Sequence, residues 1–175
     1  MNIFGLGMSV AAAAMLIASG AVAQDKPELL GSYRDWFAYK VGSGADRQCY
    51  ALSQPKQKNP AGMKRDDVFF LISTWPGKKV REEPSIVPGY SYKDGSKVQV
   101  QVGADKFEFF TRNEGSSGGG AWLDDPAQER RLVETMKRGA AFSITGLPEH
   151  GAMTRDSYSL SGISAALEKV AASCK

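Results

Sequence analysis

The chain has 175 residues, of which 23% are charged and 42% hydrophobic, and its formal net charge is +3. These proportions are ordinary for a globular protein, and the charge is too small to indicate a nucleic-acid-binding protein. No internal repeat of useful length is present, which leaves the order of the elements along the chain as the main guide.

Met1–Ala23 has the pattern of a secretory signal peptide. An apolar stretch, Ile3–Ala18, is followed by the small-x-small triplet Ala21-Val22-Ala23, which predicts a mature chain that starts at Gln24. No Lys or Arg precedes the apolar stretch, and an uncleaved membrane anchor is the alternative. The stretch is shorter than the roughly 20 residues that a membrane span needs, which favours cleavage.

The remaining 152 residues fit one domain without a transmembrane span. Residues 24–34 are polar and predict a flexible lead-in, so the expected domain is a single β-rich unit over 35–175. Its first strands are Asp35–Val41 and Arg47–Ser53, and Gln54–Asp66, with two prolines and a glycine, is an expected exposed loop.

The middle of the chain predicts further strands. Val68–Trp75 is apolar on both faces and reads as a central buried strand, whereas Pro84 and Pro88 confine the next piece to an edge or a loop. Tyr90–Val102 predicts a β-hairpin with its turn at Asp94-Gly95. Phe107 and Phe109 alternate in another strand, Lys106–Thr111, which is followed by an expected mobile loop, Gly115–Gly120. That loop lacks the Gly-Lys-Ser/Thr of a phosphate-binding loop.

Two helices are expected late in the chain. Asp125 caps the first, with Pro126 at its first position and Gly139 at its end, and Ala141–Thr145 is the strand after it. Tyr158 and Leu160 alternate with serines in a last strand, and Ser161 is a plausible cap of the closing helix. The closing helix has one apolar face, made of Ile163, Ala166, Leu167, Val170 and Cys174. The predicted fold is mainly β, an antiparallel β-sandwich or partly open barrel with two helices near the C-terminus.

The two cysteines, Cys49 and Cys174, are 125 positions apart. Export would place them in an oxidising compartment, where pairing is the usual outcome. We expect a disulfide that ties the last helix to an early strand; two buried free thiols and a reactive thiol are the alternatives.

No catalytic, cofactor-binding or metal-binding residues are assigned. The single histidine, His150, lies in a Pro-Glu-His-Gly loop, and paired cysteines would leave too few ligands for a metal. His150 and Asp156 would suit a serine hydrolase, but no Gly-x-Ser-x-Gly turn presents a nucleophile. The acidic pairs Asp66-Asp67, Glu82-Glu83 and Asp124-Asp125 are neighbours in sequence, so the two carboxylates of each pair tend to point apart rather than toward one substrate. The sequence therefore favours a binding protein over an enzyme. Trp36, Trp75 and Trp122 are expected in the core or at its rim rather than on a ligand platform.

Positive charge is concentrated between Arg47 and Arg81, where eight basic residues oppose only Asp66 and Asp67. If the loops of this segment lie side by side, they would bind anionic glycans or lipid headgroups; otherwise they are solvated loops. The candidate polyanion-binding residues are Lys56, Lys58, Lys64, Arg65, Lys78, Lys79 and Arg81.

Several short motifs together resemble the invasion-associated locus B family of exported bacterial proteins. They are Asp35-Trp36, Cys49-Tyr50, Gly89–Tyr92, Phe107–Thr111 with Ala121-Trp122, Met136–Gly139, and Thr154–Gly162 with Ala165-Ala166 and Cys174. The resemblance implies a β-rich envelope protein, periplasmic, outer-membrane-associated or secreted, that is linked in some pathogens to host-cell entry and virulence. It implies no catalytic residues. A further cysteine pair of some members has no counterpart in Arg112–Ala121.

The expected function is therefore non-enzymatic binding of an envelope or host-surface partner, either a protein or an anionic glycan or lipid. Two other functions stay open: a periplasmic hydrolase that acts on envelope material, and a soluble carrier of a small apolar ligand.

Overall fold

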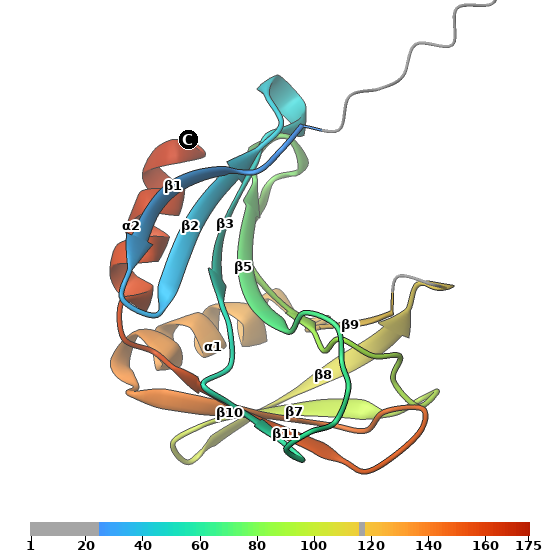
Figure 1. Ribbon diagram of the computed structural model, residues 1–175. Coiled ribbons are helices and arrows are strands. Elements are labelled where there is room, and N and C mark those ends of the chain that lie inside the picture. The colour runs from blue at the N-terminus through green and yellow to red at the C-terminus, as the bar shows by residue number, and fades with distance from the viewer. Residues whose placement is uncertain (1–24, 116–117) are drawn as a thin grey trace, which may run out of the picture.

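The computed structural model describes residues 25–115 and 118–175, which form one antiparallel sheet and two α-helices (Figure 1). The signal peptide predicted for 1–23 lies outside these residues. The strands are β1 Glu28–Tyr33, β2 Trp36–Val41, β3 Gln48–Ser53, β4 Gln57–Asn59, β5 Phe69–Trp75, β6 Val80–Val87, β7 Lys97–Val102, β8 Asp105–Asn113, β9 Gly119–Trp122, β10 Ala141–Gly146 and β11 Thr154–Ser159. The helices are α1 Pro126–Arg138 and α2 Ile163–Ser173, and two short 3-10 turns cover Gly44–Asp46 and Pro76–Lys78.

The sheet has the strand order β1-β2-β3-β5-β6-β9-β8-β7-β10-β11-β4, with every neighbouring pair antiparallel. It bends so that its two halves cross: β1, β2, β3 and β5 form one half, and β8, β7, β10 and β11 pass beneath it (Figure 1). The sheet does not close into a barrel, because its ends, β1 and β4, do not pair. The predicted mainly β, sandwich-like fold with two late helices is confirmed.

An aromatic cluster joins the two halves. Phe70 of β5 packs against Trp36 of β2 and Phe142 of β10, with ring centroids 6.2 and 5.0 Å apart. Phe142 stacks in turn on Tyr158 of β11 at 4.7 Å. The indole nitrogen of Trp36 donates a hydrogen bond of 3.0 Å to the carbonyl oxygen of Ser159. The core therefore lies between the halves, and the strand residues that alternate with these face away from it.

Helix α1 begins and ends where the sequence predicts. The Asp125 side chain accepts a hydrogen bond of 2.8 Å from the backbone N–H of Ala127, and Gly139 follows the last turn. Its apolar stripe is buried and packs against β6 and β8. The cap and the apolar stripe depend on residues that are close together in the chain, so the sequence alone predicts the position of this helix.

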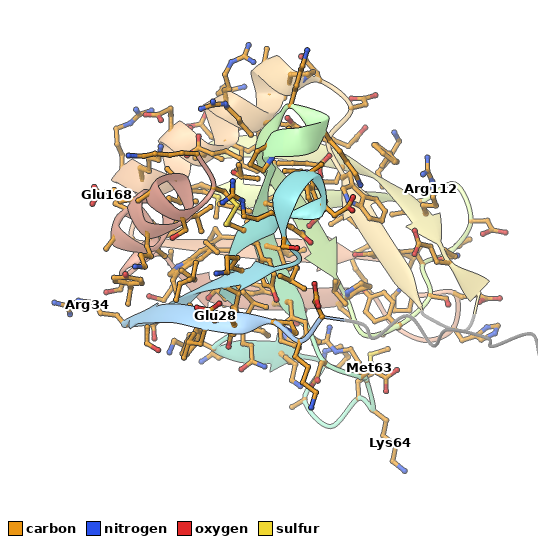
Figure 2. The ribbon with its side chains drawn as sticks, turned by 90° about the horizontal axis from the view of Figure 1, so that it is seen from above. Glu28, Arg34, Met63, Lys64, Arg112 and Glu168 are labelled. Atoms are coloured by element: carbon orange, nitrogen blue, oxygen red, sulfur yellow. A yellow bond between two sulfur atoms is a disulfide. The ribbon has the colours of Figure 1, made fainter. Side chains whose placement is uncertain are left out.

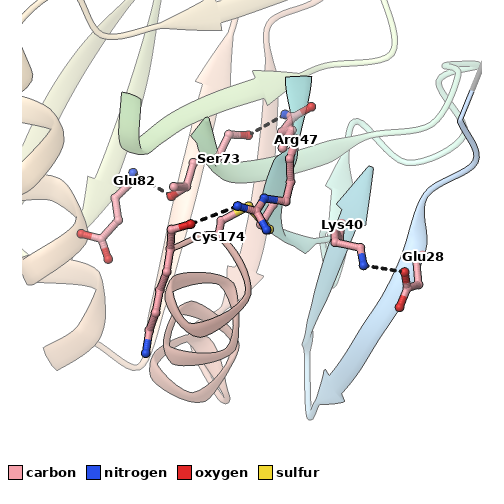
Figure 3. Close-up of a disulfide and its surroundings, with 10 residues drawn as sticks. Glu28, Lys40, Arg47, Ser73, Glu82 and Cys174 are labelled. Atoms are coloured by element: carbon pink, nitrogen blue, oxygen red, sulfur yellow. Dashed lines mark hydrogen bonds and ion pairs between the residues drawn. A yellow bond between two sulfur atoms is a disulfide. The ribbon is translucent and has the colours of Figure 1, made fainter. Parts of the chain in front are cut away.

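Helix α2 packs on β1, β2 and β3, and the predicted disulfide between Cys49 and Cys174 is confirmed. The two Cα atoms lie 5.9 Å apart, and Arg47 donates a hydrogen bond of 3.0 Å to the carbonyl oxygen of Lys175 beside the bond (Figure 3). The helix starts one residue later than expected, because its N-cap is Gly162 with φ 98° rather than Ser161.

The loose lead-in predicted for residues 24–34 is wrong for Glu28–Tyr33, which form the edge strand β1. Its backbone pairs with β2, and Leu30 packs against the core. The loop predicted over Gln54–Asp66 likewise contains a short strand, β4, which pairs with β11. Neither strand has a clear alternating pattern of its own, and β4 has only three polar residues, so their tertiary partners make them strands.

Two predictions around the prolines and the hairpin are also wrong. β6 contains Pro84 yet lies inside the sheet, between β5 and β9. The proline is tolerated there because β9 pairs only with Ser85 and Ile86. The turn at Asp94-Gly95 forms, with the Ser96 N–H donating to the Lys93 carbonyl at 3.0 Å. Its first arm does not pair with β7, however, because β8 and β10 occupy both sides of β7. The mobile loop predicted over Gly115–Gly120 includes 116–117, which lie outside the described residues, and its end belongs to β9.

Candidate functional site

A buried ion pair lies at one end of the core. The two terminal nitrogens of Arg65 donate hydrogen bonds of 2.8 and 2.6 Å to the two carboxylate oxygens of Asp156. Asp156 lies on the core-facing side of β11, and the two side chains are only 1% and 5% exposed. Arg65 was a candidate polyanion-binding residue, but its charge is already neutralised by Asp156. It holds the loop before β5 against the sheet.

Polar and aromatic groups surround this pair. The Arg65 guanidinium lies 5.9 Å from the centre of the Tyr90 ring, and the Tyr90 hydroxyl is 2.6 Å from the hydroxyl of Thr154. The hydrogen bonds to Asp156 raise the pKa of Arg65, and burial raises the pKa of Tyr90 and Tyr158. Arg65 therefore stays charged and the two tyrosines stay neutral at neutral pH, which suits a structural role.

Lys58 of β4 lies close to Arg155 of β11, which pairs with Asn59, the next residue of β4. An open pocket of about 470 Å³ is lined by Gln57, Lys58, Asn59, Ala61, Arg155 and Ser157. We call it the β4–β11 pocket. Lys58 and Arg155 are exposed, and Lys64 projects from the adjoining loop (Figure 2). Among the described residues, none of these three cations forms an ion pair. Lys56 differs, because it pairs with Asp35 and thereby lowers the pKa of that carboxyl.

The other basic residues lie elsewhere. Lys78 belongs to the turn between β5 and β6, at the far end of β5 from the loop that carries Lys64, and Lys79 and Arg81 follow it. A seven-residue strand such as β5 is about 20 Å long, so the two basic segments do not form one surface. Lys78 lies over the Trp75 ring, 5.0 Å from its centre. Arg155 was missed, because neither its sequence neighbours nor a charge run marks it; only the pairing of β4 with β11 brings it to Lys58.

The hydrolase arrangement considered for His150 and Asp156 is not assembled. The His150 side chain is 91% exposed, with Glu149 at 3.8 Å, whereas Asp156 is buried against Arg65. In the described part of the chain, no group of three His, Cys, Asp or Glu side chains is placed to hold a metal ion. No helix there is long and apolar enough to cross a bilayer.

A second cleft, of about 500 Å³, lies between β6 and the start of α1 and was not foreseen. Its lining includes Glu83 and Glu129, and burial raises the pKa of both carboxyls, with Glu83 adding to the shift of Glu129. Glu83 and Glu129 are 129 − 83 = 46 positions apart, and no local pattern connects them.

The comparisons with known proteins add one finding about the fold. A crystal structure of invasion associated protein b from Bartonella henselae superposes with a TM-score of 0.57 over 84% of this chain and 96% of that one. The chain has the fold of that protein. The two sequences are 16% identical, so the expected resemblance is confirmed at the level of fold. No protein-family model matches the sequence, and no curated protein is similar enough to count as a relative.

Proposed function

We propose that this protein is an exported, non-enzymatic binding protein that recognises an anionic glycan or lipid on the bacterial envelope or a host surface. The observation that carries the proposal is a set of exposed cations that form no ion pair among the described residues: Lys58 and Arg155 line the β4–β11 pocket, and Lys64 lies on the adjoining loop. Their charges attract a polyanion, and the amides of Gln57 and Asn59 add hydrogen-bonding groups for sugar hydroxyls or phosphates.

The location in the envelope rests on separate support. The N-terminal pattern is that of a signal peptide, and a disulfide persists in an oxidising compartment such as the periplasm. The structural neighbour is described as invasion associated, and we propose that recognition of a host or envelope polyanion is this chain's corresponding role. No specific observation favours a hydrolase or a ligand carrier: the His150 side chain is 91% exposed, and Asp156 is bound to Arg65 instead.

Binding of the mature protein to immobilised heparin and to lipopolysaccharide, measured at two salt concentrations, tests the proposal. We expect the variant Lys58→Glu/Lys64→Glu/Arg155→Glu to lose most of the binding, and added salt to weaken that of the wild type. The matched control is Lys78→Glu/Lys79→Glu/Arg81→Glu, which reverses as many charges at the far end of β5. Equal loss in both variants, or none in the first, contradicts the proposed site.

A further inference from the structure

One half of the sheet has an apolar face that points away from the core. The strand register aligns Phe37 with Leu52, Leu52 with Leu71, Leu71 with Ser85, Ser85 with Trp122 and Trp122 with Phe110. A parallel row contains Leu29, Tyr39 and Tyr50, and a third contains Phe69 and Val87. We call these side chains the outer aromatic face. The residues that alternate with them, such as Ala38, Ala51 and Ile72, are buried in the core.

Neither helix covers this face. α2 packs on the core side of β1, β2 and β3, where Cys49 holds its end, and α1 packs on β6 and β8 through residues of the same core. Figure 1 shows both helices on one side of β5 and none on the other. The face keeps contact with solvent in the described part of the chain: Leu29 is 52% exposed, Val87 is 36% exposed, and the others are partly buried.

The other half of the same sheet provides an internal comparison. The outward-facing residues of β7, β10 and β11 are polar, as on an ordinary solvated sheet face, and include Gln99, Gln101, Ser143, Thr145 and Ser157. An apolar outer face on β2, β3, β5 and β9 is thus a local departure from that pattern. Contiguous exposed apolar patches of this kind mark interaction surfaces.

The packing of the rings indicates what kind of surface fits. Tyr39 and Tyr50 stack at 5.4 Å with their planes 21° apart, and Phe110 lies beside Trp122 at 6.0 Å. These contacts between neighbouring rings make the apolar side chains of the face one continuous layer. Such a layer suits a second sheet face, because two sheets pack about 10 Å apart through interdigitated side chains.

The size of the face matches that of a protein interface. The longest row crosses six strands about 4.8 Å apart and is therefore roughly 25 to 30 Å wide, which is the width of a standard interface of about 800 Å² per partner; the other two rows add five apolar side chains. The second row continues from Tyr50 through Ser73 to Glu83, and Arg112 follows Phe110 on the same side of β8, so polar and charged side chains border the apolar ones. A second copy of this chain presents the same apolar layer, and a two-fold axis brings the two layers together.

We propose that two copies of this protein associate through the outer aromatic face. Sedimentation equilibrium of the mature, disulfide-bonded protein tests this, with the variants Leu52→Glu and Leu71→Glu at the centre of the face and Gln99→Glu on the polar half as the control. We expect a concentration-dependent dimer in the wild type and the control. Each central variant should dimerise about a hundredfold more weakly or worse, because two buried like charges then meet across the axis.

Near-ultraviolet circular dichroism and thermal melting separate lost association from lost folding in these variants. A wild-type protein that stays monomeric at about 1 mM, the weak limit of specific affinity, overturns the proposal. So does a dimer that survives in both folded central variants. Binding of monomeric wild type to neutral phosphatidylcholine vesicles, abolished by Leu71→Glu, would instead assign the face to a lipid surface.

Discussion

Arg65 and Asp156 form a bidentate ion pair that is almost completely removed from solvent. It connects the loop before β5 to the core-facing side of β11, 91 positions later in the chain. The pair explains why one member of a basic run is unavailable for ligand binding, and why Asp156, the aspartate considered as a catalytic partner of His150, is unavailable for catalysis.

Removing one member of this pair should destabilise the protein strongly. We expect Asp156→Ala to lower the free energy of unfolding by about 3–5 kcal/mol, because it leaves the Arg65 charge buried without a partner. Urea denaturation of the wild type and the variant measures the effect. The double variant Arg65→Met/Asp156→Leu should recover much of the loss, since it leaves no buried charge. A double variant less stable than Asp156→Ala would show that the pair contributes more than charge compensation.

Gly162 should not tolerate a side chain. Its φ is 98°, and a Cβ atom there would lie 1.9 Å from the carbonyl oxygen of Tyr33 in β1. We expect Gly162→Ala to cost about 3 kcal/mol from the left-handed backbone and the overlap together. The matched control is Gly103→Ala, which has φ 58° and no atom within 4 Å of its Cβ, and should cost only about 1 kcal/mol. Similar melting temperatures for the two variants would refute this explanation of how α2 meets β1.

The cleft between β6 and α1 should make stability depend on pH. The pKa of Glu129 is raised above its ordinary 4.5, chiefly by burial and then by Glu83, so the folded state binds its proton more tightly than the unfolded state. The contribution of Glu129 is therefore most favourable below pH 4.5 and declines as the pH rises through the raised pKa. We expect Glu129→Gln to stabilise the protein at pH 7 by about half a kcal/mol, given partial exposure, and to lose this advantage near pH 4.

Thermal melting at the two pH values measures that difference. The control is Glu168→Gln on the exposed side of α2, for which no comparable gain at pH 7 is expected. A stabilisation by Glu129→Gln that is the same at both pH values would mean that shape, and not charge, accounts for the effect.

Several features of this protein were determined by the sequence itself, because their signals are local or leave a single choice. The cap at Asp125 and the stop at Gly139 define α1 through backbone hydrogen bonds within a few residues. The apolar spacing from Ile163 to Val170 defines the buried face of α2. With only two cysteines in the chain, the one possible intramolecular disulfide follows once the compartment is oxidising.

Other features were decided only by the tertiary structure, because they depend on partners far away in the chain. Glu28–Tyr33 is a strand because β2 pairs with it, and Pro84 is tolerated within the sheet because β9 stops short of it. In the sequence Arg65 is not distinguishable from the other basic residues of its loop, and only the fold places Asp156 of β11 against it. Arg155 lies near Lys58 only because β4 pairs with β11. The outer aromatic face likewise arises from the register of seven strands, β1, β2, β3, β5, β6, β9 and β8, since no single strand reveals which neighbours its outward side chains will have.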